Sequence, residues 1–317
     1  MNFLSIFVLI PLLMMIALFF AKNRGLINFV AATGATILLA FSAILTYMYL
    51  AERASGNVAE MLFRADVVWY AAFNIHYSVG VDGVSVAMLL LTSVIVFTGV
   101  FASWRIDPLP KEFFLWFCLL SIGVYGFFIS IDLFTMFMFY EIALIPMYLL
   151  IGIWGTGKKE YAAMKLTLML MGGSALLLVG ILGIYYFSGA ESMNILDIAQ
   201  KTIPLSAQYY LFPLTFMGFG VLGALFPFHT WSPDGHASAP TAVSMLHAGV
   251  LMKLGGYGAF RVAMYLMPEA AHEMAWIFLI LTGISVVYGA FSAVVQTDLK
   301  YINAYSSVSH CGLVLFA

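Results

Sequence analysis

Three ionisable side chains lie inside apolar stretches that are long enough to form membrane helices: Glu141, His247 and Lys253. Glu141 follows Asp132 by about nine residues, which places it roughly 14 Å into a helix and near the middle of a hydrocarbon core about 30 Å thick. A charge at that depth costs about 2.5–3.5 kcal/mol on insertion scales, so it needs a reason. Carboxyl, imidazole and ammonium groups bind and release protons, and these residues therefore point to proton transfer.

The spacing of the two basic residues bears on how protons would pass between them. His247 and Lys253 are six residues apart, which on an ideal helix is about 9 Å along the axis and about 120° around it. They cannot touch directly, although a chain of water molecules could connect them. His247 is either a proton relay or a hydrogen-bonded core histidine. Pro146 weakens the helix near Ile142 and could admit water beside Glu141.

Two further basic residues are candidates for the same chemistry. Lys165 lies about one turn inside an apolar segment, where it either extends its stem to the membrane surface or acts near Glu141. His310 lies about a dozen residues into the last apolar segment. It either continues the polar row or is a buried, hydrogen-bonded histidine. Three serines lie close to it in sequence: Ser306, Ser307 and Ser309.

The stretch from Gly220 to Gly258 must position several of these groups, because the apolar pattern is interrupted there. Proline removes a backbone donor and disfavours helix in the preceding residue, and backbone freed at membrane depth needs protein or water as a partner. A broken helix beside a wet cavity is therefore expected. Asp234 follows Pro233 and precedes Gly235, which indicates a structural turn. The break also contains Pro227 and Pro240. His229 and His236 are expected at or near the membrane boundary, where either could be a water-exposed structural histidine.

The composition indicates a polytopic membrane protein. The chain has 317 residues, of which 63% are hydrophobic and 9% charged, and its mean hydropathy is +1.02, outside the range of a soluble domain. A span needs about 20 apolar residues. About ten helices are expected, at 3–21, 27–50, 84–104, 113–130, 132–153, 162–187, 209–229, 241–265, 274–295 and 299–317.

The basic residues predict the orientation. With the N-terminus outside, seven basic residues lie in cytoplasmic turns and four lie outside, as the positive-inside rule favours. The cytoplasmic set is Lys22, Arg24, Arg105, Lys111, Lys158, Lys159 and Lys300, and the outer set is Arg53, Arg64, Lys201 and Arg261. Residues 51–83 then form the longest outer loop, in which Asp82 caps the next helix; residues 188–208 form a second polar outer loop.

The sequence offers no site for a cofactor or metal. Cys118 and Cys311 lie in apolar segments without metal-ligand spacing, and core packing is expected for both. The sequence contains no GxGxxG, Walker A or zinc motif, so any redox centre is expected in other chains. The first segment carries its basic residues behind it and is expected to be a retained helix. The last one reaches Ala317 without polar residues beyond it, so a truncated chain is expected.

Several runs resemble one protein family. DLFTMFMFYEIALIPMYLLIGIWG, PFHTWSPDGHASAPTAVSMLHAGVLMKLGGYG and TDLKYINAYSSVSHCG resemble the antiporter-like membrane subunits of respiratory NADH:quinone oxidoreductase (complex I), most closely the subunit M, or chain 4, branch. The GVDGVS stretch is similar to its N-terminal region. The similarity covers nearly the whole chain, and the combination of motifs is specific.

The resemblance implies about fourteen transmembrane helices in two inverted five-helix repeats, each with one broken helix. About ten are present here. Residues 1–110 would be N-terminal helices and an outer loop, 111–266 the first repeat, and 267–317 the truncated start of the second. It also implies a bacterial inner membrane, other membrane-arm subunits as partners, no cofactor in this chain and no nucleic acid. In that family Glu141 would pair with a helix-seven lysine, and Lys253 would join a polar axis through which redox work in other subunits moves protons outward.

Two departures from the family pattern matter. The helix-seven lysine would fall five residues before Pro227, where this sequence has Leu222. His247 is a candidate to replace it. The second departure is that helices eleven to fourteen are absent.

The alternatives to a complex I subunit are a subunit of a multisubunit sodium–proton antiporter, a subunit of a membrane-bound hydrogenase, and a non-pumping structural partner.

Overall fold

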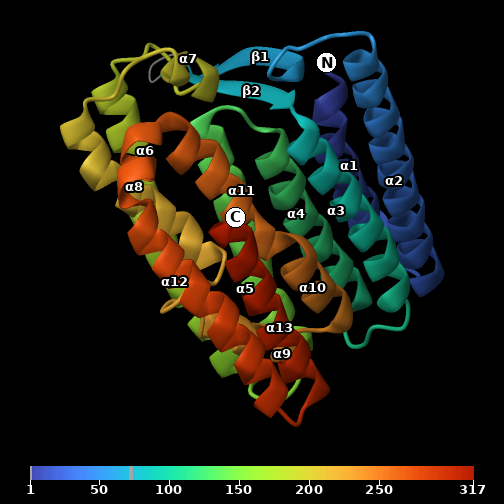
Figure 1. Cartoon of the computed structure of the whole chain (residues 1–317). Coiled ribbons are helices and arrows are strands. Elements are labelled where there is room, and N and C mark those ends of the chain that lie inside the picture. Colours follow the sequence, from blue (N-terminus) through green and yellow to red (C-terminus); the bar gives the residue numbers. More distant parts are fainter. Residues whose placement is uncertain (1, 71–73) are drawn as a thin grey trace.

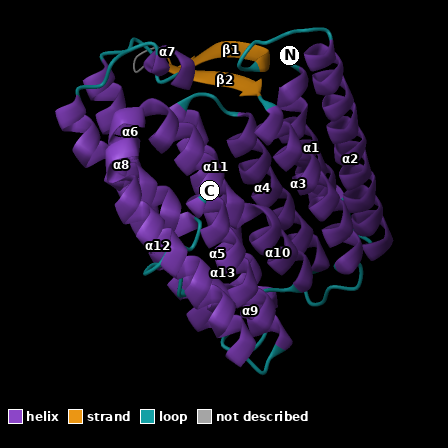
Figure 2. Ribbon diagram, viewed as in Figure 1, coloured by secondary structure: helices purple, strands orange, loops and turns teal. Residues whose placement is uncertain are grey.

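The computed structural model describes residues 2–70 and 74–317, and most of this part of the chain is helical. Long helices run roughly side by side, and a β-hairpin lies across one end (Figure 1). Figure 2 shows that the loops collect at the two ends of the helices. The elements are η1 (Phe3–Ser5), α1 (Ile6–Phe20), α2 (Arg24–Ala54), β1 (Leu62–Tyr70), β2 (Ile75–Val81), α3 (Gly83–Ala102), α4 (Pro110–Ile129), α5 (Leu133–Trp154), α6 (Lys159–Ser188), α7 (Ile195–Ala199), α8 (Leu205–Leu222), α9 (Trp231–Ser238), α10 (Thr241–Leu246), η3 (His247–Leu251), α11 (Met252–Gly258), η4 (Ala259–Met264), α12 (Pro268–Val295) and α13 (Leu299–Phe316).

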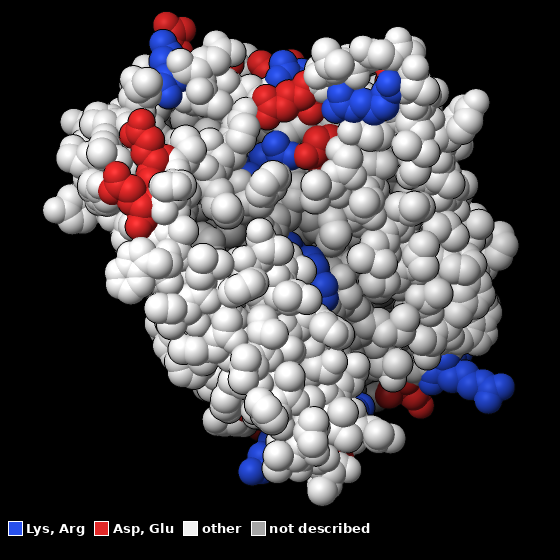
Figure 3. Space-filling model, in the orientation of Figure 1, with Lys and Arg blue, Asp and Glu red and all other residues white. Residues whose placement is uncertain are grey.

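Among the described residues, seven helices are long and apolar enough to cross a membrane: η1 with α1, α2, α3, α4, α5, α6 and α12. They correspond to seven of the predicted ranges. The other three ranges also contain helix, in α8, in the path from α10 to η4, and in α13. Helix α4 is the most buried of the seven, because α1, α3 and α5 pack around it. Charged side chains on the face drawn in Figure 3 gather toward the two ends, as expected for a protein with an apolar belt.

The hairpin corrects the expectation of a plain outer loop over 51–83, of which positions 71–73 lie outside the described residues. Strands β1 and β2 pair antiparallel, with Asp66 opposite Ser78. Alternating apolar and polar residues in IHYSVGV suit a half-buried strand, and β2 continues its pairing onto the start of α5, where Ile131 N donates to Ser78 O at 3.0 Å. The all-helical expectation therefore holds for most of the chain, with this hairpin as the exception; short helix α7 likewise lies in the predicted loop 188–208.

The predicted helix over 209–229 is wrong beyond Leu222, where α8 ends. The chain turns through the next eight residues before α9 begins at Trp231. Side chains satisfy backbone groups that the break exposes, as membrane depth requires. The indole Nε1 of Trp231 donates to Val221 O at 3.0 Å, and Phe226 N donates to Ser285 Oγ at 2.7 Å.

The predicted helix over 241–265 forms one path that contains two π-helical segments, η3 and η4. Such wide turns are rare and often lie at functional sites. The path crosses α8 closely at Gly255, where an added Cβ would lie 2.5 Å from both Gly223 N and Phe219 O. Glycine is therefore required at this crossing.

Candidate functional site

Glu141 lies in α5 with one carboxylate oxygen buried in the protein. Its Oε1 has no hydrogen-bond partner among the described residues. The helix that carries it is capped at its start by Asp132, whose Oδ1 accepts from Thr135 N at 2.8 Å. Pro146 lies inside the same helix. A buried carboxyl oxygen without a partner is costly, so it needs a reason.

Two histidines that follow the break, one in α9 and one in η3, meet inside the protein. His247 is fully buried, its ring stacks on Trp231 with centroids 5.3 Å apart, and the His236 ring lies 5.5 Å away. His236 contacts Ser244 through Nδ1, but its Nε2 and both His247 nitrogens have no hydrogen-bond partner among the described residues. Among the described residues, no side chain or backbone group therefore holds the His247 ring by a hydrogen bond.

Lys253 follows His247 across the π turn η3, and its Nζ donates to Ala248 O. The wide turn explains this contact. Met252 N bonds to His247 O, rather than to the Ala248 O that an α-helix would use, so this carbonyl is available to the ammonium group. The angle of about 120° between His247 and Lys253, which was calculated for an ideal α-helix, does not apply across this π turn.

Lys165 pairs with Asp234 and not with Glu141. Its Nζ lies 2.7 Å from Asp234 Oδ2, and both side chains are about a quarter exposed. Tyr301 OH donates to the other oxygen of Asp234 at 3.3 Å. The expectation that Asp234 forms a structural turn is wrong: it lies in the first turn of α9, where the helix dipole favours a carboxylate.

A polar cleft of about 570 Å³ opens beside this ion pair, at the end of the molecule opposite the hairpin. Lys300 lines the cleft and donates to Ala237 O at 3.1 Å and Ala239 O at 3.2 Å. These carbonyls lie at the C-terminal end of α9, where a cation is favourable. Other lining residues come from the α5–α6 turn, α6, α9 and α13: Thr156, Lys158, Tyr161, Asp234, Ser238 and Tyr301.

The structure does not bring His310 into this group. Its side chain is exposed on the outward side of α13. Cys311, the next residue, is buried, and its thiol contacts Lys253. Leu222, which stands where the family pattern has a lysine, is also buried. The inward face of α13 near Lys253 is thus provided by Cys311 and not by His310.

Sequence reasoning missed an ion pair at the hairpin end. Asp82 caps α3 as predicted, because its Oδ1 accepts from Ser85 N at 2.8 Å. Its other oxygen pairs with Arg261, which the sequence placed only among the outer basic residues. The two are 179 positions apart. Asp82 and Arg261 were both predicted at the outer ends of apolar segments, and this shared position is the sequence feature that could have indicated the pair.

Comparisons with known proteins agree with this geometry. The family described as NADH:quinone oxidoreductase/Mrp antiporter, TM, matches residues 130–317. NAD(P)H-quinone oxidoreductase chain 4-2 of Synechocystis sp. is 38% identical over 247 residues, which cover 78% of this chain and 44% of that protein. NADH-quinone oxidoreductase subunit M of Rickettsia prowazekii is 35% identical over 318 residues, covering 98% of this chain and 64% of that protein. This chain thus spans about half to two thirds of these relatives.

A solved structure has the same fold. A chain of respiratory complex I from Thermus thermophilus with bound NADH superposes with a TM-score of 0.86 at 24% identity, covering 98% of this chain and 63% of that one. Since the family match extends over more than half of the sequence and includes Glu141, the break and Lys253, this chain belongs to the NADH:quinone oxidoreductase/Mrp antiporter transmembrane family.

Proposed function

We propose that this chain is part of a proton-translocating membrane-arm subunit of a bacterial NADH:quinone oxidoreductase, driven by redox work in other subunits. One observation carries the proposal: buried proton-binding atoms, Glu141 Oε1 and both ring nitrogens of His247, lack hydrogen-bond partners among the described residues. Ionisable groups inside a membrane are costly, and they usually mark the pathway of a transported ion or proton. The relatives named subunit M and chain 4 support this over the alternatives.

The proposed route begins at the polar cleft. Water there reaches Lys165 and Asp234, which form the uptake group. Protons then pass to His236 and His247, and on to Lys253. Water molecules would bridge these steps, because His236 Nε2 and both ring nitrogens of His247 have no hydrogen-bond partner among the described residues. Glu141 exchanges protons with this row from α5, and His247 takes over from the helix-seven lysine that Leu222 replaces.

We also propose the finer architecture that the resemblance implies. The chain would cross the inner membrane of a bacterium about ten times, with α8 and α9 as the halves of a broken helix. Residues 111–266 would form the first repeat and 267–317 the start of the second. The hairpin would face outward, since basic turns gather at the opposite end, and other membrane-arm subunits would cover parts of the surface.

The matched family description also includes Mrp antiporters, so sodium–proton exchange is the second candidate function. The two functions differ in their energy source. NADH-dependent acidification of vesicles supports the oxidoreductase, whereas sodium-dependent proton release without NADH supports exchange. A hydrogenase partner or a non-pumping structural role would give neither result.

The test compares Glu141→Gln with Glu160→Gln in the full-length protein within its assembled complex. Glu160 is exposed in the first turn of α6 and serves as the matched control. NADH-driven acidification of inverted vesicles should fall several-fold in Glu141→Gln and stay at the original rate in Glu160→Gln, with the assembled amount equal. Full acidification in both Glu141→Gln and Lys253→Ala would support a structural role instead.

A further inference from the structure

Arg261 is a buried charge that the proposed proton route does not use. It lies in the π segment η4, and only 5% of its side chain is exposed. Its guanidinium lies 5.7 Å from the Tyr257 ring centroid and 5.9 Å from that of Tyr265. An arginine does not lose its proton in proteins, so this site holds a permanent positive charge.

Two carboxylates connect this arginine to the hairpin end of the molecule. Asp82 forms an ion pair with Arg261 NH2, and Glu60 Oε1 lies 3.8 Å from NH1. The Glu60 side chain is 45% exposed, whereas that of Asp82 is only 16% exposed. Figure 3 shows acidic and basic side chains side by side near this end. The carboxylates therefore form a series from the surface to the interior.

Hydroxyl groups extend the series inward from Asp82. Ser85 Oγ donates to Asp82 Oδ1 at 2.7 Å and lies 2.8 Å from Tyr257 OH in a buried hydrogen bond. Tyr257 follows Lys253 by four residues, so the two side chains share one face of the helix. Proton-exchanging groups thus extend from the hairpin surface to the helix face that carries Lys253.

We propose that Arg261 closes this outer path to protons. Its guanidinium pairs with Asp82 and lies beside Glu60, so neither carboxylate is free to carry a proton inward. Without the guanidinium, Asp82 would keep only its hydrogen bonds from Ser85, and a poorly solvated carboxylate without a counter-charge favours its protonated form. The series from Glu60 to Tyr257 would then conduct protons back into the polar interior. The inference rests on the proposed function, because it requires that interior to carry protons.

The test measures passive proton permeability in proteoliposomes that contain the full assembled complex, without NADH. An acid pulse is applied, and the decay of the pH gradient is followed with an internal pH dye. Arg261→Gln should speed the decay several-fold. Arg64→Gln, a change in an exposed arginine of β1, should leave the decay unchanged. Because no pumping is measured, this result is independent of the Glu141 test.

A double variant separates a lost seal from damaged packing. Arg261→Gln with Asp82→Asn removes the carboxyl group that would carry the proton, so the decay should return close to that of the unmodified complex. Damaged packing would make the double variant at least as leaky as the single one. That result, or no leak in Arg261→Gln, would overturn the proposal.

A histidine variant is used if Arg261→Gln does not assemble. Arg261→His should leak more at pH 8 than at pH 6, because imidazole loses its charge over that interval. A leak that does not rise with pH would contradict the seal.

Discussion

Lys165 Nζ lies 2.7 Å from Asp234 Oδ2, so helix α6 is joined by an ion pair to the short helix that follows the break. This pair lies at the wall of the polar cleft, with the buried histidines of α9 and η3 behind it. A pair about one quarter exposed stabilises a fold by only about 0–1 kcal/mol. The position of the pair beside the cleft and the histidines is therefore a better guide to its role than its contribution to stability.

Asp234→Asn is expected to slow NADH-driven acidification several-fold, because the cleft then lacks the carboxylate that pairs with Lys165, while the free energy of unfolding falls by no more than about 1 kcal/mol. Lys165→Gln combined with Asp234→Asn should be no slower than Asp234→Asn alone, since both act at one step. Asp107→Asn, an exposed change at the same end of the molecule, is the control. Additive losses in the double variant would contradict a shared step.

The helix positions could be predicted because the apolar runs alone determine them. The caps at Asp82 and Asp132 were also predictable, since each acidic residue directly precedes such a run. Depth in the membrane follows from counting residues along each apolar run, so Glu141 and Lys253 could be identified as ionisable residues far from the membrane surface. These inferences need only local sequence and the thickness of the bilayer.

Pairing between distant segments could not be predicted in this way. Lys165 had two candidate environments, and nothing local to it indicates Asp234, 69 positions away. The π turn at His247 depends on packing against neighbouring helices, and the stack on Trp231 depends on how the chain turns after Leu222. Each of these features arises from tertiary contacts that helical periodicity does not encode.

His247→Phe and His247→Ala together separate proton relay from packing. Phenylalanine keeps a ring against Trp231 but lacks nitrogens, whereas alanine leaves a cavity that costs roughly 2–4 kcal/mol. Acidification should fall in both variants, and the melting temperature should fall clearly only in His247→Ala. Assembly is checked by the amount of complex recovered. Unchanged acidification in His247→Phe would mean that the imidazole nitrogens carry no protons.

Gly255→Ala should disrupt the crossing of α11 over α8. The added Cβ would lie 2.5 Å from backbone atoms of both Gly223 and Phe219, which cannot move aside as a side chain can. We expect a loss of about 2 kcal/mol or more in stability and less assembled protein. Gly172→Ala is the matched control, because an added Cβ there meets nothing within 4 Å, and helix propensity should leave it neutral or up to about 1 kcal/mol more stable. Equal melting temperatures for the two variants would show that the crossing tolerates a methyl group.

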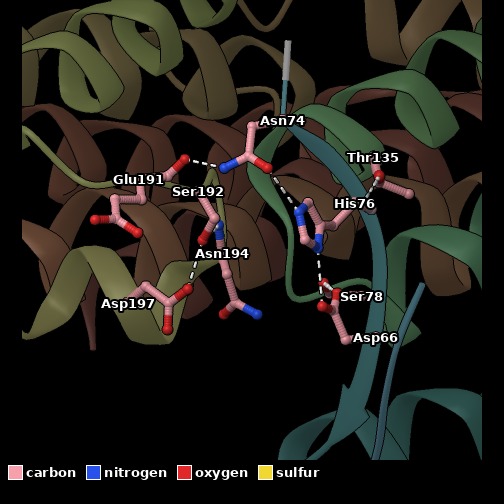
Figure 4. Close-up of polar contacts among 9 residues, drawn as sticks. All are labelled: Asp66, Asn74, His76, Ser78, Thr135, Glu191, Ser192, Asn194 and Asp197. Carbon is pink, nitrogen blue, oxygen red and sulfur yellow. Dashed lines mark hydrogen bonds and ion pairs between the residues drawn. The ribbon is translucent and has the colours of Figure 1, made fainter. Parts of the chain in front are cut away.

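The hairpin carries a hydrogen-bond cluster around His76 (Figure 4). His76 Nδ1 contacts Asp66 Oδ2 at 2.8 Å, and Nε2 contacts Asn74 Oδ1 at 3.0 Å. The Asn74 amide nitrogen donates to Glu191 O, which fixes the oxygen toward the ring. Both ring nitrogens therefore face side-chain oxygen atoms.

This cluster should weaken in acid through Asp66. Partial burial alone would raise the pKa of Asp66. Hydrogen bonds from Ser78 and His76 and the His76 charge outweigh it, and together they lower the pKa of Asp66 from its ordinary value of 3.8. A lowered carboxyl pKa stabilises the folded state fully above the ordinary value, and this contribution is lost as the pH falls through the folded-state value. Amide hydrogen exchange in β1 and β2, normalised to the intrinsic rate at each pH, should therefore accelerate below about pH 3.8 and stay slow at pH 5. Asp66→Asn should exchange faster at pH 5 and lose this pH dependence; if its acid response equals that of the unmodified protein, another group is responsible.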